Sequence, residues 1–273
     1  MIRLMRSYLM CPPTYFNVQL ATNDWMDTTA SVDLELANKQ WAQLKETYEQ
    51  LGHSVELLDP VPNLPDMVFS ANAAFSVDGA VLGARFRFPH RAAEAVVQQR
   101  WYATHGWTRF TVPTHINEGE GDLVYLPASG LILAGYGFRT DPAAHPEVSE
   151  TLSRPVVSLR LVDKRFYHLD LALFALNDAV PAYYPDAFSS SSQRILAQLF
   201  PDALLATELD ALAFGLNAVS DGHHVVMPPG ATQLQDALVR RGYEPICIDL
   251  SELVKGGGSI KCCTAELRPG TAR

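Results

Sequence analysis

The sequence predicts a five-bladed α/β propeller, and three observations point to that fold. Turn signals recur at intervals of 51, 48 and 44 residues, at Asp78-Gly79, Ser129-Gly130, Asn177-Asp178 and Asp221-Gly222. A helical pattern precedes each turn. The last unit lacks its closing strand, which the apolar N-terminal segment 3–9 can supply, so that the two ends of the chain meet in one blade. Periods of this length are typical of propellers and solenoids, and a helix in every unit indicates the α/β type.

The first helix has the clearest pattern. Apolar residues recur three and four positions apart from Leu34 through Trp41 to Leu51, which predicts an amphipathic helix that ends at Gly52. The same reasoning places further helices at about 89–105, 146–152, 189–199 and 234–241. Strands are expected at 55–58, 108–112, 156–161 and 243–248, with hairpin arms at 73–77 and 80–84, at 123–126 and 131–134, and around the turns at 177 and 221.

An open α/β sheet with accidental spacing is the alternative to a ring. The repeat favours the ring, because the units share one order of helix, strand, loop and hairpin, and the N-terminal segment can complete the last of them. The pattern continues from one end of the sequence to the other, so residues 1–273 are expected to form a single domain.

Composition excludes several classes of protein. Hydrophobic residues make up 48% of the chain and charged residues 19%, as in a soluble globular protein. The formal net charge of −9 argues against nucleic-acid binding, which depends on clustered Lys and Arg. Arg6 interrupts the apolar N-terminus, and no apolar run approaches the length of a membrane span. We therefore expect a cytoplasmic protein with no nucleic-acid or membrane partner.

The cysteines are expected to be reduced thiols. Cys11, Cys247, Cys262 and Cys263 form no C-x-x-C pair, and a disulfide between the adjacent Cys262 and Cys263 would be strained. Cys11 is expected to be packed in the core. If the segment around Cys262 is extended, Cys263 points the opposite way and is structural.

Chemically active residues follow the predicted strands at equivalent places in the repeat. They are Asp66, the run 118–122 (Glu-Gly-Glu-Gly-Asp), His168 with Asp170, the segment 210–217, and Cys262. In a ring, equivalent loops face one central opening, so these residues are expected to converge. A thiolate, an imidazole and carboxylates together suit attack on a cationic carbon electrophile.

The sequence that carries these residues resembles the guanidino-group-modifying pentein family. This family includes arginine deiminases, dimethylarginine dimethylaminohydrolases, arginine dihydrolases and amidinotransferases. The resemblance covers nearly the whole chain and implies a five-bladed α/β propeller formed as one catalytic domain. It rests on six motifs in order, at 10–13 (MCPP), 65–69 (PDMVF) with Asn72, 118–122 (EGEGD), 137–141 (GFRTD), 168–170 (HLD) and 257–262 (GGSIKC).

The resemblance also implies roles for individual residues. Cys262 would be the nucleophile, His168 the general acid/base, and Glu118 the carboxylate that orients His168, with Glu120 as the alternative to Glu118. The remaining residues would bind the substrate, with Asp66 and Asp170 on the guanidinium, Arg139 and Arg87 on the α-carboxylate, and Asn72 matching the Asn of the dihydrolase branch.

No cofactor is expected, because the sequence has no phosphate-binding glycine loop and no clustered metal-ligand spacing. A metal site would use His168, Asp170, His223, His224 and the acidic run. Against it, the adjacent His223 and His224 would diverge across a strand, at a hairpin remote from the converging loops.

The predicted function is hydrolysis of a guanidinium C–N bond in arginine or an Nω-methylated arginine, through a covalent thiouronium intermediate on Cys262. The product would be citrulline, or ornithine if citrulline is also accepted. The alternatives are an amidinotransferase that uses the same intermediate and a propeller that binds a small ligand without catalysis. The sequence leaves open which arginine derivative is the substrate and whether the chain forms a homo-oligomer.

Overall fold

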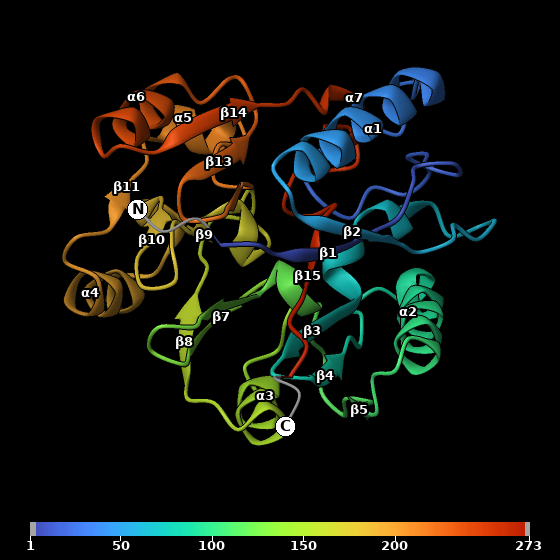
Figure 1. Ribbon diagram of the computed structural model, residues 1–273, viewed down its shortest axis with the longest axis horizontal. Helices are drawn as coiled ribbons and strands as arrows, with labels where there is room; N and C mark the ends of the chain where they lie inside the picture. Colours follow the sequence, from blue (N-terminus) through green and yellow to red (C-terminus); the bar gives the residue numbers. More distant parts are fainter. Residues whose placement is uncertain (1–3, 271–273) are drawn as a thin grey trace.

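The computed structural model describes residues 4–270 and contains five three-stranded sheets arranged in a ring (Figure 1). In each sheet the inner and middle strands pair antiparallel, and the outer strand lies parallel to the middle strand. The ring confirms the predicted propeller and excludes the open sheet.

The innermost strand of each blade is largely buried, and the outermost strand is the most exposed. Written from the inside outward, the blades are β15 (Ala265–Leu267), β1 (Ser7–Met10) and β2 (Ser54–Leu57); β3 (Ala74–Val77), β4 (Ala80–Gly83) and β5 (Arg109–Thr111); β6 (Leu123–Leu126), β7 (Leu131–Tyr136) and β8 (Val156–Arg160); β9 (Leu173–Ala175), β10 (Pro181–Tyr183) and β11 (Leu204–Leu205); β12 (Val219–Ser220), β13 (His224–Met227) and β14 (Glu244–Cys247).

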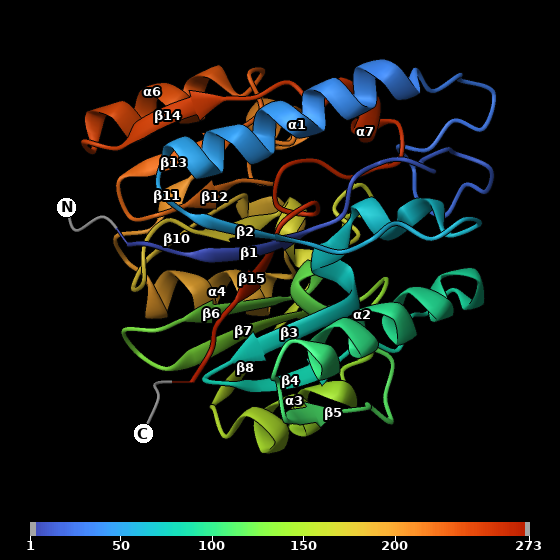
Figure 2. The ribbon, with the colours of Figure 1, turned by 45° about the vertical axis from the view of Figure 1, so that its right-hand side comes forward.

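The first blade is closed by the two ends of the chain. Strand β1 pairs antiparallel with β15, with Ser7 opposite Leu267 and Leu9 opposite Ala265 (Figure 2). This confirms the predicted closure, although the strand starts at Ser7 and position 3 of the predicted segment lies outside the described residues. Residues far apart in sequence therefore share one blade.

Helices lie around the outside of the ring (Figure 1). On α1, an Asp33 cap accepts a hydrogen bond from the Leu36 amide, and Trp41, Leu44 and Tyr48 face the core as predicted. The α-helices are α1 (Leu34–Gln50), α2 (Ala92–Thr104), α3 (Ala144–Leu152), α4 (Ser190–Leu199), α5 (Glu208–Leu212), α6 (Thr232–Arg240) and α7 (Ser251–Val254). None of the helices within residues 4–270 has both the length and the apolar character needed to cross a lipid bilayer.

Several boundaries differ from the sequence-based expectation. Helix α2 begins at Ala92, because Pro89–Arg91 forms a separate 3-10 turn, and α3 begins two residues before Pro146. A Pro in the first helical turn is tolerated, because its missing N–H would have no intrahelical partner there. The short helices α5 and α7 were not predicted; α5 is stabilised by a Thr207–Asp210 capping box.

The first predicted turn has the backbone conformation that a tight hairpin requires. At the first hairpin, Asp78 and Gly79 have φ values of 50° and 77°, as in the type I′ turns that match strand twist. In four of the five blades, a turn joins the inner strand to the middle strand. The segments that enter the inner strands lie at the opposite end of those strands, and they carry the candidate site.

Candidate active site

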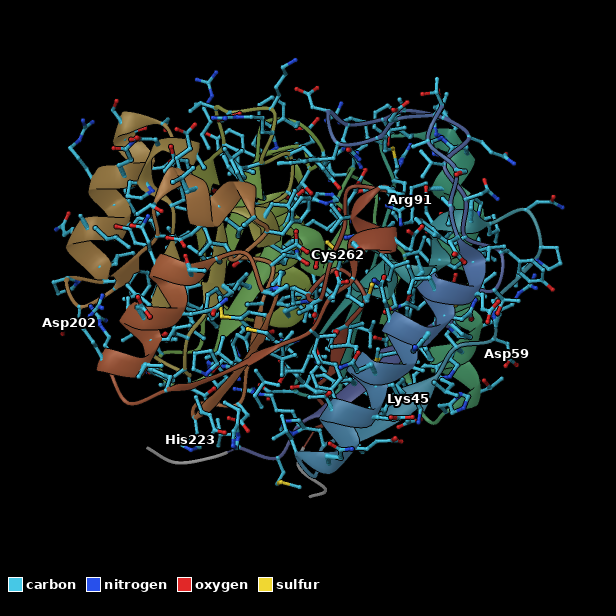
Figure 3. All side chains as sticks on the ribbon, turned by 90° about the horizontal axis from the view of Figure 1, so that it is seen from above. Lys45, Asp59, Arg91, Asp202, His223 and Cys262 are labelled. Carbon is cyan, nitrogen blue, oxygen red and sulfur yellow. The ribbon has the colours of Figure 1, made fainter. Side chains whose placement is uncertain are left out.

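Cys262 lies in the turn between the glycine-rich segment 256–258 and β15, and a view from the side of the ring places it near the middle of the molecule (Figure 3). Its thiol is buried and donates to Asp170 Oδ2 at 3.1 Å. Asn217 Nδ2 donates to the Cys262 sulfur at 3.1 Å, and Asn217 Oδ1 accepts from the Cys262 backbone amide at 3.2 Å. Side chains that precede the inner strands of two other blades, β9 and β12, thus fix the sulfur.

The electrostatics of this thiol favour a cationic partner. Burial raises the pKa of Cys262 well above its ordinary value, and the Asp170 carboxylate raises that pKa further. Burial also raises the pKa of Asp170. A positive charge beside both groups would lower both pKa values. The arrangement therefore suits a site in which the cation itself helps to form the thiolate.

His168 is held by a buried carboxylate. Its Nε2 lies 2.8 Å from Glu118 Oε2, with both side chains almost wholly buried. The other ring nitrogen, Nδ1, is buried and has no hydrogen-bond partner among the described residues. A donor bond from Nε2–H to Glu118 would leave Nδ1 as the basic atom, as in an imidazole positioned for proton transfer.

The Glu118 carboxylate joins His168 to Arg139 within the site. Although burial acts in the other direction, hydrogen bonding to His168 and the charge of Arg139 hold the pKa of Glu118 well below its ordinary value. Arg139 Nη1 donates to Glu118 Oε2 at 2.9 Å, and the Arg87 backbone amide donates to Oε1 at 3.1 Å. Glu118 therefore remains ionised and can stabilise a protonated His168.

The three acidic residues of the run 118–122 have different partners. Glu120 turns away from His168 and forms ion pairs with Lys261 at 2.7 Å and Arg268 at 2.6 Å. Asp122 accepts from the Leu169 backbone amide at 3.0 Å and so holds the segment next to His168. The structure thus places Glu118, and not Glu120, against the imidazole.

The glycines of this run allow close packing around the site. Gly119 has φ +54°, and a Cβ there would meet Ala74 O at 2.6 Å. A Cβ on Gly121 would lie 2.6 Å from Asn72 Nδ2 and 3.1 Å from His168 Nδ1. Any larger residue at position 121 would displace one of these two polar side chains.

Asp66 and Asn72 lie on a second wall of the site, together with Arg91. Arg91 donates to Asn72 Oδ1 at 3.1 Å and forms a 2.8 Å ion pair with Glu94. The buried Asp66 carboxylate is 3.7 Å from Arg91 Nε. Asn72 Nδ2 and Asp170 Oδ1 are buried and have no hydrogen-bond partner among the described residues.

Arg139 has partners that were not expected. Besides Glu118, it donates to Thr22 O at 3.2 Å, and its guanidinium lies over the Tyr167 ring at 4.4 Å. The Arg87 guanidinium donates to the Arg139 carbonyl at 2.9 Å, but its side chain is exposed and does not line the pocket. Binding of a substrate carboxylate by these two residues stays a prediction.

The pocket over Cys262 is nearly closed. Its cavity volume is about 10 Å³, room for roughly one water molecule. Asp66, Asn72, Arg91 and Arg139 line it with Cys262, and Thr22, Asn23 and Met26 of the long N-terminal loop cover it. The cavity is therefore smaller than an amino acid.

Two residues at the site were missed by sequence reasoning. Asn217 ends the segment 210–217, but a single amide in a mostly apolar stretch gives no sign of a role at the sulfur. Asp210 of that segment caps α5 and accepts the Leu234 backbone amide at 3.0 Å. Arg91 lies in a stretch whose pattern indicates only an amphipathic helix. Its position on the buried face of that stretch is the available signal, because a buried Arg needs charged partners.

The residues considered as metal ligands do not come together at the centre of the ring. His223 lies in the turn before β13, and His224 is the first residue of that strand. Figure 3 shows His223 at the edge of the molecule, whereas Cys262 lies near the middle of the view. The expected separation from the site is confirmed. The expectation that the two imidazoles diverge is wrong, because His223 precedes the strand and does not follow its alternation; the ring centroids are 4.6 Å apart. All four cysteines are free thiols, as expected.

Comparison with known proteins agrees with this geometry. Residues 13–269 match the family described as N,N dimethylarginine dimethylhydrolase, eukaryotic. An N(G),N(G)-dimethylarginine dimethylaminohydrolase of Mycobacterium tuberculosis is 52% identical over 97% of this chain and 86% of its own length. The bifunctional arginine dihydrolase/ornithine cyclodeaminase ArgZ of Synechocystis is 35% identical over 94% of this chain, but only 37% of its own length.

A solved structure gives the same fold. The N-terminal domain of ArgZ, as a cysteine-to-serine mutant bound to substrate, superposes with a TM-score of 0.92 at 33% identity, over 97% of this chain and 99% of that one. The family match, the sequence identity over nearly the full length and the five-bladed ring agree. The chain therefore belongs to the dimethylarginine dimethylaminohydrolase family of guanidino-modifying penteins.

Proposed function

We propose that this protein hydrolyses a guanidinium C–N bond of arginine or an Nω-methylated arginine, with arginine preferred. The observation that carries the proposal is the buried Cys262 thiol, 3.1 Å from the Asp170 carboxylate, in the same site as the 2.8 Å His168–Glu118 pair. A nucleophile, an anion for the substrate cation and an oriented proton carrier are what this reaction needs. The family and its named relatives support the same reaction class.

In the first half-reaction, the substrate guanidinium binds beside Asp170 and lowers the pKa of Cys262, whose proton passes to His168. The thiolate adds to the central carbon of the guanidinium. The imidazolium, stabilised by Glu118, then protonates the departing nitrogen, which leaves as ammonia or a methylated amine. A thiouronium remains on the Cys262 sulfur.

In the second half-reaction, neutral His168 takes a proton from water. The resulting hydroxide adds to the thiouronium carbon, and the C–S bond breaks. The product is citrulline, and the thiolate is reprotonated for the next cycle. The unpartnered Nδ1 of His168 supports both proton transfers, since it is the ring nitrogen that Glu118 does not engage.

The preference for arginine follows from the two carboxylates. Asp66 and Asp170 are both buried, and each can accept N–H bonds from an unmodified guanidinium. A dimethylated nitrogen has no N–H to donate and would leave a buried acceptor unpaired. That costs on the order of 1–3 kcal/mol, or roughly tenfold to a few hundredfold in kcat/KM.

Complete hydrolysis to ornithine is a second candidate, favoured by Asn72. Its Nδ2 is buried without a partner among the described residues. Asn72 Nδ2 and His168 Nδ1 both lie beside Gly121, so the amide is close to the imidazole. An amide there could hold citrulline, or a second water, for another cycle. The named activity of ArgZ, an arginine dihydrolase, is consistent with this outcome.

Product analysis by mass spectrometry tests the proposal. One preparation is incubated with arginine, asymmetric dimethylarginine or citrulline, each with and without glycine as an amine acceptor. We expect ammonia with citrulline or ornithine from arginine, and no amidino transfer to glycine. A clear preference for dimethylarginine would show that the two-carboxylate clamp is wrong, and transfer to glycine would identify an amidinotransferase. Absence of any turnover would favour the ligand-binding alternative.

A further inference from the structure

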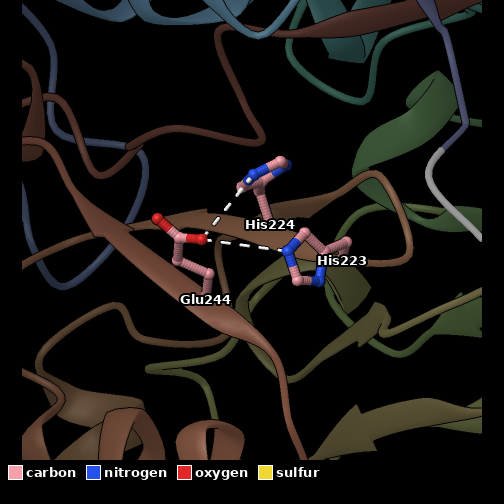
Figure 4. A group of neighbouring side chains, drawn as sticks. All are labelled: His223, His224 and Glu244. Carbon is pink, nitrogen blue, oxygen red and sulfur yellow. Dashed lines mark ion pairs between the residues drawn. The ribbon is translucent and has the colours of Figure 1, made fainter. Parts of the chain in front are cut away.

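His223, His224 and Glu244 form a cluster of metal-ligating side chains outside the candidate active site (Figure 4). His223 Nε2 lies 3.8 Å from Glu244 Oε2, and His224 Nε2 lies 3.9 Å from the same oxygen. One ligand atom from each residue lies within 4.8 Å of the others. Two imidazoles and a carboxylate are a common ligand set for zinc and related divalent metals.

The backbone holds this cluster in place. His224 is the register partner of Glu244 in the parallel pair β13–β14, and the Glu244 amide donates to the His223 carbonyl at 2.9 Å. All three residues therefore sit on one edge of the fifth blade. The pairing of β13 with β14 thus keeps the three side chains close to one another.

A second, buried carboxylate orients one of the imidazoles. His224 Nδ1 lies 2.8 Å from Asp221 Oδ2, and the other oxygen of Asp221 accepts the backbone amides of His223 and His224 at 2.8 and 2.7 Å. A carboxylate on Nδ1–H fixes the tautomer in which Nε2 carries the lone pair. This is the support that metal-binding histidines usually have, and it directs Nε2 of His224 toward Glu244.

We propose that His223 Nε2, His224 Nε2 and Glu244 Oε2 bind one divalent transition-metal ion such as Zn²⁺. Tetrahedral coordination with bonds of about 2.0–2.1 Å brings ligand atoms to roughly 3.3 Å from one another. The present separations need only small side-chain rotations, and the side chains of His223 and Glu244 are 39% and 63% exposed. The fourth position would hold water.

The expected role of the metal is structural. It would join the turn that leads into β13 to the outer strand β14, within a blade whose inner strand β12 has only two residues. The cluster lies at the edge of the molecule, away from Cys262 (Figure 3). Metal binding here should change thermal stability and leave the hydrolytic chemistry of the proposed active site unchanged.

The test is Zn²⁺ binding by isothermal titration calorimetry, in a Cys262→Ser background that removes the competing active-site thiol. We expect one ion per chain, with affinity reduced at least about tenfold by His223→Ala or by His224→Ala. His115→Ala is the matched control, because His115 pairs with Glu147 on the surface but has no second imidazole beside it among the described residues. The control should bind Zn²⁺ with unchanged affinity.

Thermal melting separates loss of the ligand from loss of folding. Zn²⁺ should raise the Tm of the Cys262→Ser protein and of the control, but not that of the two histidine variants. Without metal, His223→Ala should keep the Tm of its parent, whereas His224→Ala should start lower because it loses the bond to Asp221. Copper(II) added in place of Zn²⁺ should give an electron paramagnetic resonance spectrum with two nitrogen ligands. Failure to bind Zn²⁺ at roughly 100 µM, or equal binding in parent and histidine variants, would overturn the proposal.

Discussion

Cys262 and Cys263 are adjacent buried thiols with different surroundings. Only Cys262 contacts Asp170 and Asn217, whereas the amide of Cys263 bonds to the Ser259 carbonyl in a packed turn. Cys262→Ser should therefore lower kcat by at least about 1,000-fold, because a hydroxyl is a much weaker nucleophile toward this carbon. Steady-state release of ammonia or citrulline is the measurement.

Cys263→Ser is the control for that experiment. It places a hydroxyl in an apolar site and should cost stability, while kcat changes by less than about tenfold. Equal loss of activity in both variants, with both still folded by circular dichroism, would contradict the assignment of Cys262 as the nucleophile.

The hydrogen bonds of Asn217 lead to a prediction that the sequence alone does not provide. Its side chain bonds to the Cys262 sulfur, to the Cys262 amide and to the Asp170 carbonyl at 3.1 Å. Asn217→Ala should lower kcat roughly tenfold to a hundredfold, since about 1.5–3 kcal/mol of hydrogen bonding to the developing thiolate is lost. KM should change much less.

A purely structural role for Asn217 would give a different result. The variant would lose thermal stability, and its remaining folded fraction would turn over at the normal rate. Active-site titration with an alkylating agent that labels Cys262 gives the folded fraction, so that kcat can be expressed per competent site.

At the scale of the element, the turn 119–121 that enters β6 is built around close contacts. Gly121→Ala should lower kcat by at least about tenfold, because its methyl group would displace Asn72 or His168 from the positions in which they touch residue 121. Citrulline formation under saturating arginine is the measurement.

Gly106→Ala provides the comparison for Gly121. Gly106 has φ +81°, and a Cβ at this position would have nothing within 4 Å, so alanine there should cost about 1–2 kcal/mol of stability through backbone strain and leave kcat intact. Similar activity losses in the two variants would show that general destabilisation, not the contact with His168 and Asn72, explains the effect.

Most elements could be predicted from the sequence, because repeated local signals specify them. The turn at Asp78-Gly79 and the pattern around Trp41 are examples, and both were found where expected. Features that depend on contacts across blades could not be predicted. The Arg139–Thr22 bond joins residues 117 positions apart, and no local pattern identifies it.

The same division holds for the positions of the candidate site residues. The convergence of Cys262, His168 and Asp170 follows from equivalent places in a repeat, which is a whole-chain signal. Two contacts depend on the residue at which a strand begins, because side chains along a strand point alternately to its two faces. They are the bond of Asn217 to the sulfur and the close approach of the His223 and His224 rings. A shift of one residue reverses the side-chain direction, and strand ends are the least predictable part of a sequence.

For the whole molecule, the buried thiols predict loss of stability at alkaline pH. Burial raises the pKa of Cys11 to about 12, and burial raises the pKa values of Cys262 and Cys263 as well. In the unfolded chain these thiols ionise near about pH 8.5, so above that pH the unfolded state binds fewer protons than the folded state. The free energy of unfolding then falls by about 1.4 kcal/mol per pH unit for each thiol.

Urea unfolding at pH 7.5 and pH 9.5 measures this effect. The midpoint should be lower at pH 9.5, and the difference between the two pH values should shrink in Cys11→Ala, which carries one buried thiol fewer. A midpoint that is the same at both pH values would contradict the burial of protonated thiols in the folded state.

The central claim is that guanidinium hydrolysis proceeds through a covalent intermediate on Cys262. The most direct measurement is intact-protein and peptide mass spectrometry of acid-quenched enzyme during turnover of arginine. The account predicts an adduct with the mass of arginine less one ammonia, confined to the peptide that carries Cys262 and absent from Cys262→Ser. Turnover of arginine with no adduct at any time point, or an adduct on Cys263 or another residue, would contradict it.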